Sequence, residues 1–209
     1  MSIVTLNDRA VRSVSAFGSL NTGSMIFIKK LTASSSGTLS FVNGSSDVVL
    51  DSTYKEYLFT FKNIHPATNR VDFQFQASTN GGSSYGVTLT TTHFKAYHNE
   101  NDDSAALPYV TGDDLAQSTS FQDICVYMGN DNEDNNSGTL TLFNPASTTF
   151  VKHFMCRTSV NFDNDAGDPY AQDQFTAGHF NTTSAINAIQ FKCTSGNIDA
   201  GDICLYGIL

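Results

Sequence analysis

The sequence predicts an all-β protein: a jelly-roll-like antiparallel β-sandwich with a short N-terminal arm. Three observations indicate this fold. Apolar and polar residues alternate in many short runs along the 209 residues, and turn residues separate the runs. No segment sustains apolar residues at helical spacing with caps at both ends. One strand-like string also occurs twice. Ten or more short strands without a clear long helix are typical of a sandwich of the jelly-roll kind.

The repeated string is SGTLSFVN at 36–43 and SGTLTLFN at 137–144. A second strand-like run follows each copy, at 52–61 and at 147–156. A unit of strand, polar turn and strand that is used twice predicts two similar hairpin-like halves that close over one core.

The chain is expected to divide into an N-terminal arm, residues 1–24, and one sandwich domain, residues 25–209. The first segment shows no sustained alternation and carries Arg9 and Arg12. We interpret it as an arm that packs on a neighbouring surface; a short helix and a frayed terminus are the alternatives. Sandwiches of this length commonly form a single domain.

Alternation justifies each strand of the sandwich. Strands are expected at 25–32, 37–43, 52–61, 71–77, 86–97, 121–127, 138–143, 150–159, 174–181, 189–193 and 201–207. In the run 71–77, Val, Phe, Phe and Ala alternate with Asp and two Gln, which predicts one face on the core and one in water. Tyr57, Phe59 and Phe61 share one face of the strand before it.

The composition indicates a globular protein that does not bind nucleic acid. Apolar residues make up 40% of the chain and charged residues 15%, which is typical of a packed domain. The formal net charge is −9, and lysines and arginines do not cluster. A nucleic-acid binder needs a basic stripe that neutralises phosphates. The acidic balance also disfavours an anionic membrane surface.

The N-terminus lacks a basic start followed by an apolar stretch, so we expect neither a signal peptide nor membrane insertion. We expect the protein to be synthesised in a cytoplasm.

The four cysteines show no close pairing. They are Cys125, Cys156, Cys193 and Cys204. Buried reduced thiols are expected, and Cys193 shares a strand face with Phe191. A disulfide between two of them is the alternative.

Two long acidic connections, 99–120 and 161–173, are the candidate binding regions. Loops at the ends of a sandwich are where binding usually occurs, because rigid strands position them while their side chains face solvent. The candidate binding residues are Asn99, Glu100, Asp102, Asp103, Asp163, Asp165, Asp168 and Tyr170.

No motif predicts a catalytic residue, a metal site or a cofactor, and we expect that the protein is not an enzyme. The segment 163–168 has carboxylates at alternate positions as calcium loops do, but its glycine is fifth instead of sixth and no Glu stands twelfth. The segment 131–136 is similar. A solvated turn is expected at both, with calcium as the alternative. The histidines lack the spacing of a metal site, and His93 and His98 are expected on opposite strand faces.

Five strings carry a resemblance to a known group of proteins. They are LNDRAVR at 6–12, STYKEY at 52–57, NIHP at 63–66, FVKHF at 150–154 and the ending GNIDAGDICLYGI at 196–208. The strings resemble virion-associated structural proteins of tailed marine bacteriophages such as cyanophages, and the ending resembles the closing strand of many phage tail-fibre and surface jelly rolls. The resemblance spans nearly the whole chain. It implies a place on the virion surface, with no catalytic motif, cofactor or binding residue to carry over.

Two virion roles fit this resemblance. The first is a tail- or fibre-associated module that attaches to a host surface glycan or protein. The alternative is a capsid decoration (cement) protein that stabilises the head with its arm and one sandwich face. In both roles we expect other tail or head proteins as partners and a homotrimer, since cyclic assembly raises avidity and buries strand edges. A carbohydrate-active enzyme is a third hypothesis, from another class.

Overall fold

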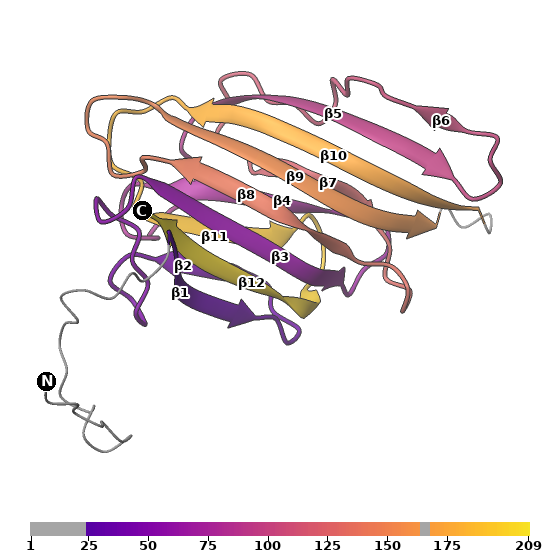
Figure 1. Cartoon of the computed structure of the whole chain (residues 1–209), viewed down its shortest axis with the longest axis horizontal. Helices are drawn as coiled ribbons and strands as arrows, with labels where there is room; N and C mark the ends of the chain where they lie inside the picture. The colour runs from indigo at the N-terminus through magenta and orange to yellow at the C-terminus, as the bar shows by residue number, and fades with distance from the viewer. Residues whose placement is uncertain (1–23, 164–167) are drawn as a thin grey trace, which may run out of the picture.

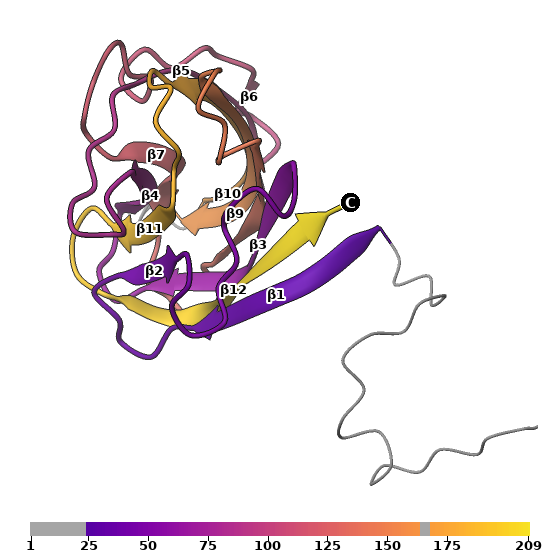
Figure 2. The same cartoon turned by 90° about the vertical axis from the view of Figure 1, so that its left-hand side faces the viewer.

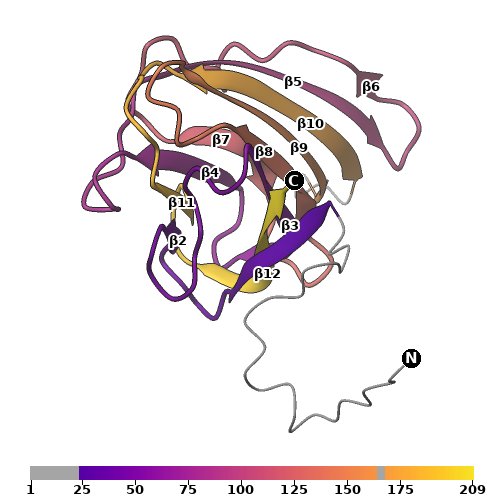
Figure 3. The same cartoon turned by 60° about the vertical axis from the view of Figure 1, so that its left-hand side comes forward.

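The computed structural model describes residues 24–163 and 168–209, and these residues form two antiparallel β-sheets (Figure 1). The eight-stranded sheet has the spatial order β1 (Met25–Thr32), β12 (Ile198–Ile208), β3 (Glu56–Pro66), β8 (Asn136–Phe143), β9 (Lys152–Asp163), β10 (Pro169–Phe180), β5 (Leu89–Asn99) and β6 (Ala105–Ala106). The four-stranded sheet has the order β2 (Leu39–Val42), β11 (Ala188–Cys193), β4 (Val71–Ser78) and β7 (Gln122–Met128). The larger sheet curves around the smaller one (Figures 2 and 3).

The two packed sheets confirm the predicted all-β antiparallel sandwich, and most strands lie close to the predicted ranges. The strand expected at 52–61 lies later in the chain, as β3. The jelly-roll arrangement remains a prediction. The short strand β6 was not predicted. β9 and β10 also extend further into the acidic connection at 161–173 than alternation indicated. Except for Ser24, the predicted arm lies outside the described residues. No helix in the described part of the chain is long and apolar enough to cross a membrane.

The prediction of two hairpin-like halves is wrong for the first copy of the repeat. The second copy does form a hairpin, because β8 pairs with β9. The first copy lies in β2, which pairs with β11 in the four-stranded sheet, whereas β3 belongs to the other sheet. The connection 43–55 crosses from one sheet to the other and buries Val48 and Leu50 on the way. Apolar residues in this connection therefore join the core instead of forming a polar turn.

The centre of the core is a cluster of aromatic rings around Phe191 on β11. Its ring centroid lies 5.3 to 6.3 Å from those of Phe41, Phe59, Phe61, Phe73 and Phe75. Most of these pairs meet edge to face, which is the favoured geometry for aromatic rings. The cluster joins both sheets, and it confirms the predicted inward faces of β3, β4 and β11.

The outer face of β4 differs from the prediction of a surface in water. Gln76 is fully buried, and its side-chain amide donates to the carbonyls of Thr119 and Ser120 at 3.2 and 2.7 Å. The connection before β7 covers this part of the sheet, so the polar side chain meets backbone carbonyls instead of water.

The four cysteines are free, and three of them are buried. Burial raises the pKa of the Cys193 thiol to about 12 and raises those of Cys125 and Cys156 well above the ordinary value. Buried thiols of this kind stay protonated and act as small apolar side chains. Cys193 and Phe191 share the buried face of β11, as predicted.

Candidate functional site

The inner face of the eight-stranded sheet changes character from one side to the other. Under β3 and β8 it is apolar, and Phe59 and Leu140 lie opposite each other there. Under β5 and β10 it is polar. The inward residues are Thr91, His93, Lys95, Tyr97 and Asn99 on β5 and Gln172, Gln174 and Thr176 on β10. Buried polar side chains need hydrogen-bond partners, and the neighbouring strand β7 provides many of them.

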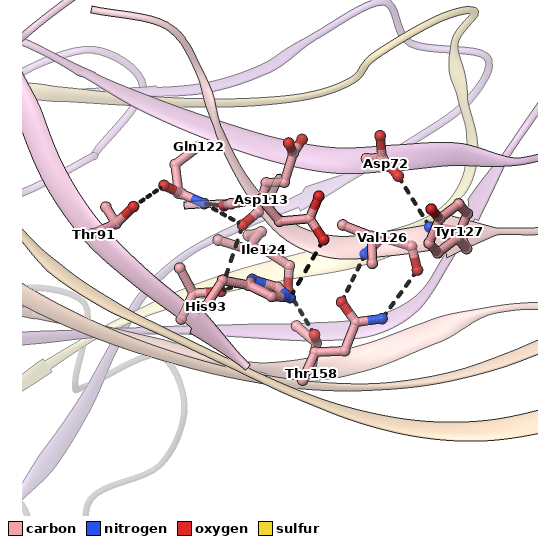
Figure 4. A network of polar contacts seen from close by, with 12 residues as sticks. Asp72, Thr91, His93, Asp113, Gln122, Ile124, Val126, Tyr127 and Thr158 are labelled. Atoms are coloured by element: carbon pink, nitrogen blue, oxygen red, sulfur yellow. Dashed lines mark hydrogen bonds and ion pairs between the residues drawn. The ribbon is translucent and has the colours of Figure 1, made fainter. Parts of the chain in front are cut away.

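The polar side chains of the larger sheet form hydrogen bonds with the backbone N–H and carbonyl groups at the free edge of the four-stranded sheet. β7 is an edge strand, so one side of its backbone lacks a strand partner. The Gln174 amide accepts the N–H of Val126 at 2.8 Å and donates to its carbonyl at 3.0 Å. The Thr158 hydroxyl donates to the Ile124 carbonyl at 2.6 Å (Figure 4). Side chains of the larger sheet therefore replace a neighbouring strand at this edge.

His93 is fully buried at the centre of this polar region (Figure 4). Its Nδ1 lies 3.0 Å from the Thr176 hydroxyl, and its Nε2 lies 4.0 Å from Asp113 Oδ2. Burial lowers the pKa of His93 to about 4, so the ring is neutral at pH 7 and forms no ion pair with Asp113. Beside it, Gln122 accepts a hydrogen bond from Thr91 at 2.5 Å and donates to the Asp113 carbonyl at 2.7 Å.

A β-bulge turns Tyr127 away from the core. The pairing between β4 and β7 advances by three residues on β7, from Met128 to Cys125, while β4 advances by two. Tyr127 has φ 62°, which is a strained backbone conformation for a bulky residue. The carboxylate of Asp72 holds it there by accepting the Tyr127 N–H at 3.0 Å. As a result, the Tyr127 side chain is 48% exposed at the end of the sandwich.

Tyr127 forms one wall of a pocket of about 500 Å³. The lining residues are Arg70, Lys95, Tyr97, Ser104, Tyr127, Phe162, Tyr170 and Gln172. The aromatic rings form two pairs. The centroids of Tyr127 and Phe162 are 5.7 Å apart, and those of Tyr97 and Tyr170 are 5.8 Å apart. Such rings suit contact with an apolar face of a ligand, while the polar neighbours suit its hydrogen-bonding groups.

Two cationic side chains lie against the aromatic wall. Lys95 Nζ lies 4.7 Å from the ring centroid of Tyr127, and Arg70 Cζ lies 5.7 Å from that of Phe162. Both distances are within cation–π range. Burial lowers the pKa of Lys95, and the carboxylates of Asp113 and Asp72 oppose this shift. The site therefore combines aromatic rings with two basic side chains.

Gln172 also lines the pocket, and it is 6% exposed. It pairs with Tyr97 on one side and with Val160 on the other. Its side-chain carbonyl oxygen has no hydrogen-bond partner among the described residues. A buried acceptor without a donor is costly, and this oxygen is therefore a ready acceptor for a ligand that brings a donor.

The structure brings together the two acidic connections that the sequence singles out. Tyr170 pairs with Asn99 where β10 and β5 lie side by side. The exposed Glu100 donates its backbone N–H to the Pro169 carbonyl at 2.9 Å. The turn after β5 and the start of β10 thus form one continuous rim next to the pocket.

The side chain of Asn99, one of the candidate binding residues, is buried and bonds within the rim. It is 1% exposed. Its amide donates to Asp103 at 2.5 Å and to Asp168 at 2.9 Å, and its carbonyl oxygen accepts the backbone N–H groups of Asp103 and Ser104. The predicted binding residues Asn99, Asp103 and Asp168 therefore hold the rim in shape by bonding to one another.

The other predicted binding residues are distributed around the same end. Tyr170 lines the pocket. Asp102 is exposed, and its carboxylate lies 3.0 Å from Nε2 of the exposed His98, which is on the opposite strand face from His93 as predicted. Asp163 is the last residue of β9, and its side chain is not described. Asp165 lies outside the described residues.

No metal site is formed by the residues that the structure describes. Across 24–163 and 168–209, no three His, Cys, Asp or Glu side chains lie close enough to hold an ion. The segment 131–136 forms a turn in which Asp134 donates its N–H to the Asp131 carbonyl at 2.9 Å. Of the segment 163–168, residues 164–167 are outside the described part.

A second depression, of about 560 Å³, lies on the outer face of the eight-stranded sheet. Arg157 and Asp173 line it and form an ion pair with nitrogen–oxygen distances of 2.5 to 3.2 Å. The Arg157 guanidinium also lies 4.8 Å from the ring centroid of Phe175. The two charged side chains that line this depression, Arg157 and Asp173, therefore already bond to each other.

Sequence reasoning missed most residues of the pocket. Lys95 and Tyr97 occupy inward positions of a strand whose preceding inward residues, Thr91 and His93, are already polar. That polar run on an expected core face was a usable signal. The apolar run at 124–128, which breaks the alternation, was a sign of the bulge that exposes Tyr127.

Comparison of the chain with protein-family models, with curated proteins and with solved structures finds no match.

Proposed function

We propose that this protein is a bacteriophage virion structural protein, displayed on the particle surface, that binds a host-surface ligand in the pocket beside Tyr127. In this role it is a tail- or fibre-associated attachment module, and its partners are other tail proteins. The proposal joins the resemblance of the sequence to virion proteins with a site whose residue types are those of recognition: aromatic rings, an amide and cations.

The observation that supports this proposal most is that strands hold the pocket in shape before any ligand binds. Tyr97, Phe162 and Tyr170 come from β5, β9 and β10, which pair in register at this end. Tyr127 is fixed by the bulge and by Asp72. A preformed site loses little conformational entropy on binding, and a site on strands is held more rigidly than one on flexible loops.

The test is competition for attachment. Purified wild-type protein, added to host cells before the particles, is expected to reduce particle adsorption. The variant Tyr170→Ala removes one ring from the pocket and is expected to lose this effect. Tyr109→Ala is the matched control, because Tyr109 is 50% exposed and lies outside the pocket.

Equal competition by wild type and Tyr170→Ala contradicts the assignment of attachment to this pocket. Absence of competition by the folded wild-type protein contradicts the attachment role itself. Circular dichroism and thermal unfolding of each variant establish that the fold is intact. Release of reducing ends from host polysaccharide during the same incubation would instead favour the carbohydrate-active enzyme.

Capsid decoration is the second candidate, and one feature of the outer sheet face favours it. Phe27, Tyr206, Leu58, Thr141 and Met155 follow one another across five strands. Phe27 is 57% and Met155 is 61% exposed. An apolar row of this kind suits contact with a head protein. The number of copies per purified particle separates the two roles: hundreds indicate the head, and a few to some dozens indicate the tail.

A homotrimer is part of the proposal for both roles. Three linked sites raise the avidity for a repeated surface ligand without any new contact, and cyclic assembly also protects strand edges. Light scattering of the purified protein tests this point, with an expected mass of three chains of 22.6 kDa. A monomeric mass at a protein concentration as high as that on the particle contradicts the homotrimer.

A further inference from the structure

The charged side chains that line the pocket are basic, although the chain is acidic overall. The chain has 20 acidic and 11 basic residues, yet the charged side chains that line the pocket are Arg70 and Lys95. Burial lowers the pKa of Lys95, and the carboxylates of Asp113 and Asp72, which lie outside the lining, oppose this shift. Two basic side chains at one pocket suit an anionic group of a ligand.

The rings and the amide add a second requirement. Tyr97 and Tyr170 form one pair and Tyr127 and Phe162 the other, so the ligand has an apolar face that contacts aromatic rings. The unpartnered carbonyl oxygen of Gln172, on a side chain that is 6% exposed, needs a hydroxyl or N–H donor. A ring with C–H groups on one face, hydroxyl groups at its edge and an attached acid meets these requirements together.

We propose that the pocket binds an acidic sugar residue of a glycan, with the acid beside Arg70 and Lys95 and a sugar hydroxyl donating to Gln172. The sugar ring lies against the tyrosine side chains. This inference rests on the proposed attachment function, because it names the chemical class of the ligand for the same pocket. The acid is a carboxylate or a sulfate ester, since both are oxyanions that guanidinium and ammonium groups bind.

The test uses the purified full chain on an array of glycans printed as matched pairs. Each pair consists of an acidic glycan and its neutral counterpart: a uronic acid against the hexose, a sialylated glycan against the asialo form, and a sulfated sugar against the unsulfated one. Binding is expected to the acidic members, at least about ten-fold tighter than to the neutral ones. The uronate, sialylated and sulfated pairs distinguish the carboxylate from the sulfate. Binding also weakens as salt concentration rises.

Three variants examine the named groups. Arg70→Gln removes one cation on an exposed turn and is expected to weaken binding of the acidic member about ten-fold while leaving a neutral member unchanged. Gln172→Met keeps the size of the side chain but removes the acceptor, and it is expected to weaken the binding of both the acidic and the neutral member of a glycan pair. Arg157→Gln removes an exposed cation on the outer sheet face and is the control that leaves binding unchanged.

Equal binding of acidic and neutral members, or no binding to any glycan on the array, overturns the inference. The attachment function is tested by separate outcomes. If wild-type protein blocks particle adsorption and Tyr170→Ala does not, while acidic glycans neither bind nor compete, the pocket is an attachment site for another ligand. If acidic glycans bind but the protein never blocks adsorption, the ligand class stands and the attachment role is wrong.

Discussion

The side chain of Gln174 bonds to both backbone groups of Val126, as a neighbouring strand would. Its carbonyl oxygen accepts the Val126 N–H at 2.8 Å, and its amide donates to the Val126 carbonyl at 3.0 Å. Both residues are buried. The contact joins the two sheets next to the bulge that exposes Tyr127, so the shape of the pocket depends on it.

Gln174→Leu is expected to destabilise the protein by about 2–5 kcal/mol, because two buried backbone groups of Val126 lose their partners. The measurement is chemical denaturation followed by circular dichroism. Gln190→Leu is the matched control. Gln190 lies on the outer face of β11 and donates to the Ser40 hydroxyl at 2.9 Å, so its loss is expected to cost less than about 1 kcal/mol. Equal losses contradict the role assigned to Gln174.

Tyr127→Gly is expected to be more stable than Tyr127→Ala by about 1 kcal/mol. At φ 62° the alanine Cβ is strained, whereas glycine adopts this backbone conformation freely. At an ordinary strand position the order is reversed, because glycine loses more conformational entropy on folding. Thermal unfolding of the two variants measures the difference, and a more stable alanine variant contradicts the bulge.

Asp123 makes the protein less stable as pH rises. Burial raises the pKa of this carboxyl to about 6, although a hydrogen bond from Gln74 opposes the shift. Between pH 3.8 and 6 the folded state therefore binds more protons than the unfolded state, and the free energy of unfolding falls with rising pH. The free energy of unfolding of Asp123→Asn, measured relative to that of wild type, is expected to rise by about 2–3 kcal/mol between pH 4 and pH 7. A difference that stays constant across this range contradicts the buried carboxyl.

His93 has the opposite effect. Burial lowers its pKa to about 4, so the unfolded state binds more protons between pH 4 and 6.5 and the free energy of unfolding rises with pH in this window. The free energy of unfolding of wild type, measured relative to that of His93→Gln, is expected to rise by about 2–3 kcal/mol from pH 4 to pH 7. Denaturation at a series of pH values measures this gain. If the difference in the free energy of unfolding between the two proteins does not change with pH, the His93 ring is solvated and the prediction is wrong.

Much of the fold could be predicted because its information is local. The alternation in β4 and β11 identified core faces that the structure confirms, down to the shared face of Phe191 and Cys193. The repeat misled for the same reason. The strings at 36–43 and 137–144 are alike, but which sheet a strand joins depends on partners far away in the chain: β11 for the first copy, and β3 for the second, which also pairs with its neighbour β9.

The pocket could not be predicted from local patterns. Tyr97 and Tyr170 are 73 positions apart and meet because β5 and β10 pair in register. Tyr127 joins them because a bulge reverses the direction expected from alternation. Two of the candidate binding residues, Asn99 and Asp168, bond to each other and shape the rim beside the pocket.

The most direct test is to map where a host-surface glycan binds on the isotope-labelled protein by nuclear magnetic resonance. Glycans released from susceptible cells are added during the titration, and chemical shifts are followed for the whole chain. The largest changes are expected at Lys95, Tyr127 and Tyr170, at the open end between the sheets. Changes centred on Arg157 and Asp173, on the outer face of the larger sheet, would contradict the account.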